Sequence, residues 1–207
     1  MSEVSGSWKT VREESQEELE HRLAQVLPTD RIRGVFFRSV QQAMLVLKGE
    51  AAMESCLAEC EERHFMDFFA YPAADFLRML RRAAWLMGAE AGGFQATLQV
   101  LGHMGTAAFL DSQAGNAMEA LISGTPRRAL EGLPMAYRVT TPTGGALSVA
   151  WLGYTHSRIT FARDFLPRPY VEGSLEAHLK KAGARAVRVT GQWTGGLSSQ
   201  YDLSWEQ

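Results

Sequence analysis

The chain has 207 residues, of which 46% are hydrophobic and 21% are charged, and this composition is typical of a globular protein. A chain of this length buries roughly 70% of the surface that its unfolded form exposes, so it needs no metal ion or disulfide to fold. The formal net charge of -2 argues against nucleic acid and anionic lipid as partners, because phosphate binding requires an excess of basic residues. The length predicts one domain over residues 1–207.

Cysteine usage and apolar runs predict a cytoplasmic protein. The N-terminal segment has no charged-then-apolar leader of a secretory signal, so Cys56 and Cys60 are expected to be reduced thiols. The longest apolar runs are far shorter than the roughly 18 residues that a membrane span requires. We therefore expect no membrane partner.

Residues 12–134 predict a helical half, because their apolar side chains recur at spacings of three and four. Ser15 and Glu18 have the spacing of a capping box. Thr125 is expected to be an N-cap, with Pro126 at the first helical position of a brief turn that Pro134 stops. About six helices precede that turn, over residues 15–27, 29–48, 50–69, 76–87, 94–110 and 114–122.

Residues 135–207 predict an antiparallel sheet that carries one helix, because from Tyr137 onward the apolar residues alternate. A helix is expected to follow Pro167-Arg168-Pro169 and to end at Gly183. Thr194-Gly195-Gly196 is typical of a hairpin between the last two strands. The expected order is β-β-β-α-β-β, and the fold class is α+β with the helical half packed on the sheet.

Three potential metal ligands, Cys56, Cys60 and His64, are four residues apart in a segment that predicts one helix, so they would lie along one stripe. Zinc or haem iron uses such ligands. However, structural zinc sites usually take ligands from two elements, with short Cys-x2-Cys turns that this chain lacks. Buried cysteine is also a common apolar filler, and we favour this interpretation and expect no metal.

His103 lies in an apolar helical segment between Gly102 and Gly105. Small neighbours let a flat ligand approach the backbone, so His103 is a candidate axial ligand of haem. The alternative is a hydrogen-bonded histidine in the interior or at its boundary. We favour the alternative and expect no cofactor.

Asp164, Tyr170 and Glu172 lie where a predicted strand leads into a predicted helix. Helix N-termini attract anions, so these residues are candidates for a ligand site or an interdomain contact. An equally good interpretation is that both carboxylates hydrogen-bond local backbone and hold the turn. The pairs His156-Ser157 and Asp111-Ser112 lack the Gly-x-Ser-x-Gly elbow of a nucleophile, so no enzymatic activity is expected.

Several segments along the chain carry a resemblance to a known family. They are Gly34-Val35-Phe36-Phe37, Tyr71-Pro72, Asp75-Phe76-Leu77-Arg78, Tyr137-Arg138, Arg163-Asp164-Phe165-Leu166-Pro167 with Tyr170 and Glu172-Gly173, and Tyr201-Asp202-Leu203-Ser204-Trp205-Glu206. In these segments the chain resembles an uncharacterised family of proteins of similar length that is expanded as paralogues in myxobacteria. The resemblance implies no catalytic residue.

The predicted order of elements is also similar to the fold of haem-based nitric-oxide sensors and vinyl-reductase-like small-molecule sensors. In the haem sensors an axial histidine comes from a helix just before the sheet, roughly where His103 lies. Those sensors carry a Tyr-x-Ser-x-Arg signature that holds the haem propionates. Here the nearest run, Tyr154-Thr155-His156-Ser157-Arg158, has a different spacing.

These observations predict a non-enzymatic sensory or regulatory domain that binds a small, mostly apolar ligand between the helical half and the sheet. The candidate ligand-binding residues are His103, Asp164, Tyr170 and Glu172. The alternative is a self-associating protein-interaction module without a small-molecule ligand, whose contact is the acidic N-terminal arm or a strand edge. A homo-oligomer or a signalling protein is the partner that this alternative implies.

Overall fold

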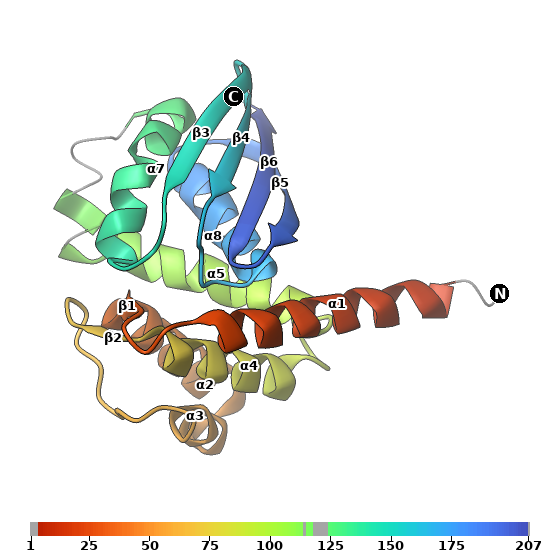
Figure 1. The fold of residues 1–207 in the computed structure, drawn as a ribbon, viewed down its shortest axis with the longest axis vertical. Coiled ribbons are helices and arrows are strands. Elements are labelled where there is room, and N and C mark those ends of the chain that lie inside the picture. The colour runs from red at the N-terminus through yellow and green to blue at the C-terminus, as the bar shows by residue number, and fades with distance from the viewer. Residues whose placement is uncertain (1–3, 114, 118–123, 207) are drawn as a thin grey trace.

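Two lobes of secondary structure lie on either side of one long helix, α5 (Phe94–Leu110), in the computed structural model of the protein (Figure 1). The structure describes residues 4–113, 115–117 and 124–206. The remaining helices and strands of the N-terminal lobe are α1 (Val4–Gln25), β1 (Arg31–Arg33), α2 (Gly34–Lys48), α3 (Glu50–Leu57), β2 (Ala70–Pro72) and α4 (Ala73–Met87). The C-terminal lobe contains α7 (Pro126–Thr140), β3 (Leu147–Gly153), β4 (His156–Phe161), α8 (Arg168–Lys181), β5 (Arg185–Gly195) and β6 (Ser198–Glu206).

The four strands of the C-terminal lobe form an antiparallel sheet in the order β3-β4-β6-β5. In this register Ile159 of β4 lies between Val149 of β3 and Tyr201 of β6. Alternate residues of each strand point to the same face, and α8 covers that face with Val171 and other buried apolar side chains. The sheet and α8 thus share one hydrophobic core.

The α+β class and the packing of helices on an antiparallel sheet are confirmed, but the prediction of three strands before the helix is wrong. Among the described residues, β3 and β4 are the two strands of this sheet that precede α8, and Tyr137 lies in α7. Thr125 caps α7 as predicted, yet Pro134 lies inside this helix. An interior proline costs a helix about 3 kcal/mol. Burial of Ala136 and Tyr137 beyond the proline offsets this cost and lets the helix continue.

Three predictions for the N-terminal lobe are also wrong. The helix expected over residues 50–69 ends at Leu57. Ser15 lies inside α1, which begins at Val4, so it is no helix cap. Residues 31–33 form a strand that pairs with residues 70–72 and not the first turn of a helix. The helix predicted over residues 114–122 falls mostly outside the described residues.

The loop after α3 is held by side chains of the segment that follows it. The Asp75 carboxylate accepts a hydrogen bond from the backbone N–H of Glu61 at 3.0 Å, and the Arg78 guanidinium donates to the carbonyl of Glu59 at 3.1 Å. The ring of Phe65 stacks on Phe37 with a centroid separation of 4.3 Å. These tertiary contacts replace the hydrogen bonds that a longer helix would make, and they explain why α3 stops early.

Helices α5 and α8 are in direct backbone contact, which joins the two lobes. A Cβ atom on Gly102 would overlap the backbone carbonyl of Tyr170, and one on Gly173 would overlap the carbonyl of Gln99. Each helix therefore presents a glycine to the backbone of the other. Within the described residues, no helix is both long and apolar enough to cross a bilayer.

Candidate functional site

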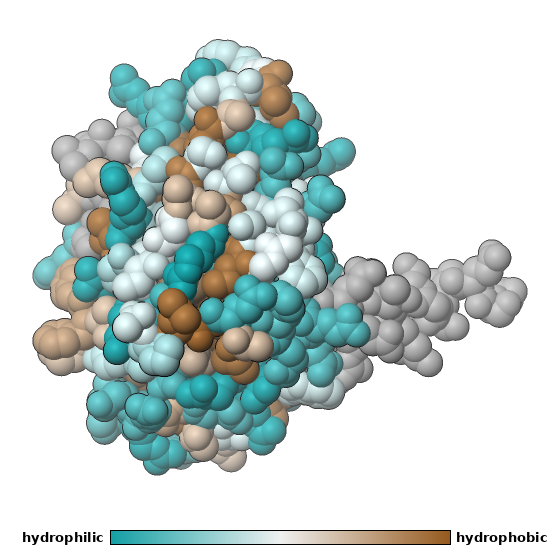
Figure 2. All heavy atoms as spheres, in the orientation of Figure 1, coloured by the Kyte–Doolittle hydropathy of each residue, from teal (hydrophilic) through white to brown (hydrophobic). Residues whose placement is uncertain are grey.

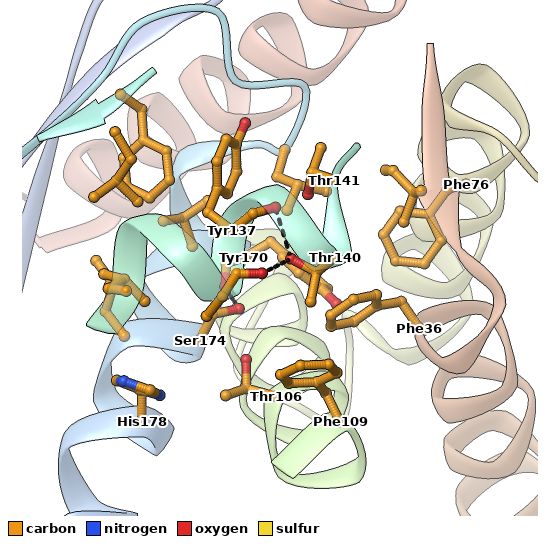
Figure 3. Close-up of a pocket in the computed structure, with 18 residues that line it drawn as sticks. Phe36, Phe76, Thr106, Phe109, Tyr137, Thr140, Thr141, Tyr170, Ser174 and His178 are labelled. Atoms are coloured by element: carbon orange, nitrogen blue, oxygen red, sulfur yellow. Dashed lines mark hydrogen bonds between the residues drawn. The ribbon is translucent and has the colours of Figure 1, made fainter. Parts of the chain in front are cut away.

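An apolar cavity of about 90 Å³ lies where the two lobes meet (Figure 3). Residues from both lobes line it, and most of them are aliphatic or aromatic. The lining residues are Ile32, Phe36, Phe76, Thr106, Phe109, Leu133, Ala136, Tyr137, Thr140, Thr141, Leu147, Phe161, Leu166, Tyr170, Val171, Ser174, Leu175 and His178. Concave, mostly apolar sites with a few polar groups are typical of small-molecule binding.

Helical spacing brings three polar lining residues to one face of α8. Tyr170, Ser174 and His178 are four residues apart on α8, so they share one face of that helix. Thr106 and Phe109 are three apart on the neighbouring helix α5 and line the same cavity (Figure 3). Helices and strands thus supply most of the lining, and Thr141 and Leu166 add to it from the segments beside α7 and α8.

Most of the polar groups around the cavity already have hydrogen-bond partners. The Ser174 hydroxyl donates to backbone carbonyl oxygen within α8, and the Thr140 hydroxyl does the same within α7 (Figure 3). The imidazole Nε2 of His178 lies 3.0 Å from the carbonyl oxygen of Ala129. The hydroxyl of Tyr170 differs, because it is buried and has no hydrogen-bond partner within the described residues.

The four predicted ligand-binding residues are not brought together. Tyr170 lines the cavity, whereas His103, Asp164 and Glu172 do not. His103 is half-buried on α5, one turn before Thr106. Asp164 and Glu172 are buried beside the N-terminus of α8, where they take part in a network of charged and polar groups.

Arg22 is at the centre of this buried network. Its guanidinium is fully buried and donates to the Glu18 carboxylate at 2.8 Å and to the backbone carbonyl of Asp164 at 2.6 Å. Glu18 in turn accepts a hydrogen bond from the backbone N–H of Arg168 at 2.8 Å. Glu172 accepts from the backbone N–H of Gly191 at 2.8 Å. The Asp164 carboxylate accepts hydrogen bonds from the Tyr137 hydroxyl and from the backbone N–H of Leu166, both at 3.2 Å. The network joins α1 to α8 and to the sheet, and both predicted carboxylates contact protein groups.

Burial raises the pKa of the Asp164 carboxyl to about 6, even though Arg22 lowers it. The ordinary pKa of this carboxyl is 3.8, so between about pH 4 and pH 6 the folded protein keeps a proton that the unfolded chain releases. We expect the free energy of unfolding to decrease by up to roughly 3 kcal/mol as the pH rises from about 4 to about 6. Urea unfolding across this range would measure the decrease.

The control for this pH dependence is Asp164→Asn, which removes the titrating group and keeps its shape. The variant should lose most of the decrease between about pH 4 and pH 6, while the contributions of all other groups remain. An equal pH dependence in both proteins would contradict a raised pKa of Asp164.

The predicted stripe of Cys56, Cys60 and His64 does not form, because α3 ends at Leu57. Cys56 is buried, Cys60 is half-buried and His64 is exposed. Burial raises the pKa of each thiol to about 12, so both stay protonated and unreactive at neutral pH. Within the part of the chain that the structure describes, no three His, Cys, Asp or Glu side chains are placed to hold a metal ion.

The contribution of α7 to the cavity was missed in the sequence. Leu133, Ala136, Tyr137 and Thr140 line it from that helix. Their spacing of three and four continues the stripe that begins with Leu130, and this signal was present. Pro134 concealed it, because an interior proline normally ends a helix.

Comparison with solved structures gives the class of fold. An H-NOX protein from K. algicida is similar, with a TM-score of 0.65 and 11% identity over 85% of this chain and 97% of that chain. An H-NOX protein from S. oneidensis in the Fe(II)NO state has a TM-score of 0.64 and 9% identity, and 85% of this chain covers all of it. One from Shewanella woodyi has a TM-score of 0.61 and 11% identity over 83% and 93% of the two chains. At this identity the likeness shows the fold alone.

The chain belongs to the family described as "Protein of unknown function (DUF2378)", which it matches over residues 25–206. The comparison with curated proteins finds no match. A further similar structure comes from a study of haem distortion in the H-NOX family, with a TM-score of 0.61, 11% identity and 85% of this chain and 96% of that chain covered. The fold thus raises the question of whether the present residues fit haem.

The residues around the cavity do not fit a haem held by His103. His103 does not line the cavity, whose volume of about 90 Å³ lies well below the roughly 300–1,000 Å³ of pockets for larger ligands. Beside His103, Gly102 is in contact with the backbone of Tyr170. Since α5 and α8 touch backbone to backbone there, no flat macrocycle can enter between them.

Proposed function

We propose that this protein is a non-enzymatic sensory domain that binds a small, mostly apolar ligand in the cavity between its two lobes, without haem. The cavity itself carries the proposal: it is apolar and is lined by both lobes, including α8 and α5. A ligand there contacts both lobes at once, so its binding energy favours one arrangement of the lobes over others. This coupling is what a sensor requires.

The fold relatives give this proposal indirect support. The similar structures from S. oneidensis and Shewanella woodyi are named for Fe(II)NO and Fe(II)CO ligation states, so those proteins hold small ligands. We propose that the present chain keeps ligand binding at the junction of the lobes with a different kind of ligand. The cytoplasmic location and the expansion in myxobacteria remain predictions.

A cavity-filling substitution tests the proposal. Thr106 points into the cavity from α5 (Figure 3), and in Thr106→Phe the larger side chain would occupy the space. We expect small apolar probes such as xenon, which occupies engineered apolar cavities, to bind the natural protein. Thr106→Phe should weaken this binding at least about tenfold. Chemical shifts of methyl groups around the cavity would measure both affinities.

Val100→Phe is the matched control, because Val100 lies on the same helix and its side chain is 39% exposed. This variant should bind the probes as the natural protein does. If no probe shifts the methyl signals of Leu133, Val171 or Leu175, the proposed function is wrong. Native mass spectrometry of freshly purified protein would detect any ligand that copurifies.

Exposed apolar side chains favour the alternative of a protein-interaction module. Met66, Phe68 and Phe69 are 60%, 53% and 59% exposed in the loop before β2. On the face shown in Figure 2, however, hydrophobic residues form small separate groups among hydrophilic ones. Size-exclusion chromatography with light scattering separates the two functions, because a strictly monomeric chain would not be a self-associating module.

A further inference from the structure

The buried hydroxyl of Tyr170 is a polar group without a partner in an apolar site. Tyr170 is 1% exposed and lines the cavity, yet its hydroxyl oxygen has no hydrogen-bond partner within the described residues. A buried polar group without a partner is costly, so native proteins usually satisfy it with protein, water or ligand. This hydroxyl therefore marks the place where a bound molecule would be held.

The fold keeps the hydroxyl in this position. The ring of Tyr170 packs against Phe76 edge to face, with the centroids 5.7 Å apart. Gly105 leaves room for the hydroxyl, because a Cβ atom at that position would overlap its oxygen. The tyrosine backbone is fixed against Gly102. Both the ring and the backbone are thus constrained, and the hydroxyl cannot easily turn away from the cavity.

The chemistry of the lining determines which ligand suits the site. Burial raises the pKa of the Tyr170 hydroxyl well above its usual value, so it stays neutral and donates a hydrogen bond. Among the described residues that line the cavity, none is Asp, Glu, Lys or Arg. A charged ligand would lose its hydration without gaining a counter-ion, so a neutral ligand is favoured. Ser174 and Thr140 already donate to backbone carbonyls.

We infer that the cavity binds a small neutral carbonyl compound, such as a ketone or aldehyde, whose oxygen accepts a hydrogen bond from Tyr170. This inference rests on the proposed function and names the class of ligand for the same site. The volume of about 90 Å³ limits the ligand to a molecule smaller than benzene, since a dry cavity of roughly 150 Å³ holds benzene. The hydrocarbon part contacts the apolar wall, and the oxygen accepts a hydrogen bond from the buried Tyr170 hydroxyl.

Two probes of the same shape test this inference. Acetone and 2-methylpropene, which are both smaller than benzene, differ only in the replacement of the carbonyl oxygen by a CH₂ group. Tyr170→Phe removes the hydroxyl and keeps the ring. We expect this variant to bind the ketone about tenfold more weakly than the natural protein does, because one hydrogen bond is lost. The hydrocarbon should bind both proteins equally well.

The outcomes separate this inference from the proposed function. Equal ketone affinity in both proteins would overturn the role of Tyr170 while the proposed function stands. If neither probe binds the natural protein, both fail. Ordered water on the Tyr170 hydroxyl that the ketone does not displace would also overturn the inference.

A measurement on the natural protein keeps the test valid even if Tyr170→Phe does not fold. The infrared carbonyl stretch of bound acetone should lie at lower wavenumber than in hexane, because hydrogen bonding weakens the C=O bond. A stretch that is unchanged from hexane would exclude a hydrogen bond from Tyr170 and overturn the inference.

Discussion

Replacing Arg22 with alanine is expected to lower the free energy of unfolding by roughly 3–5 kcal/mol, because one partner of a buried ion pair is removed. Arg22 is fully buried and bonds to Glu18 at 2.8 Å and to the carbonyl of Asp164 at 2.6 Å. Its loss leaves the Glu18 carboxylate, which is 2% exposed, with a weaker charge partner in Arg168 at 3.5 Å. Chemical denaturation followed by circular dichroism would measure the change.

Arg38→Ala is the matched control for this experiment. Arg38 also lies in a helix and pairs with Asp67 at 2.8 Å, but its side chain is 56% exposed. Exposed pairs contribute about 0–1 kcal/mol, so this variant should unfold almost as the natural protein does. Equal losses of stability in the two variants would show that burial of Arg22 has no special effect and would contradict the described network.

Gly102→Ala is expected to lower the free energy of unfolding by about 3 kcal/mol or more, although alanine is the better helix former. The added Cβ would overlap the backbone carbonyl of Tyr170. Backbone cannot move aside as a flexible side chain can, so α5 and α8 must separate. Because this separation displaces Tyr170, the variant should also lose ligand binding in the cavity.

Gly153→Ala provides the same substitution without the overlap. A Cβ atom there would meet only the Cβ of His156 at 3.6 Å, which is an ordinary van der Waals contact. The free energies of unfolding of the two variants, measured by thermal and urea unfolding, should therefore differ by most of the loss predicted for Gly102→Ala. If Gly102→Ala were as stable as Gly153→Ala, the close contact between α5 and α8 would be wrong.

Features that depend on local sequence were predicted well. The spacing of Phe76, Leu77 and Leu80 predicted α4, and Thr125 with Pro126 predicted the start of α7. Alternating apolar residues predicted the sheet and its α+β class. Each of these signals is contained within a few consecutive residues, so no knowledge of the fold was required.

Features that depend on contacts between distant residues were not predicted. The glutamates of this segment predicted an acidic N-terminal arm, yet Glu18 is buried and Arg22 bonds to Ser199, 177 positions away. The cavity combines Phe36, Thr106, Thr140 and Tyr170 from four different helices. Sequence spacing shows which residues share one face of a helix, but it does not show which helix that face will meet.

The single α+β domain inferred from length and periodicity illustrates the difference between local features and contacts of distant residues. By itself the sequence determined the class of fold, because hydrophobic periodicity of 3.6 or 2 is a local property of the chain. Only the tertiary structure decided that Tyr170 faces a cavity while Asp164 and Glu172 bind protein groups. Burial and the close approach of Gly102 to Tyr170 set these environments, and both arise only when segments far apart in the chain pack together.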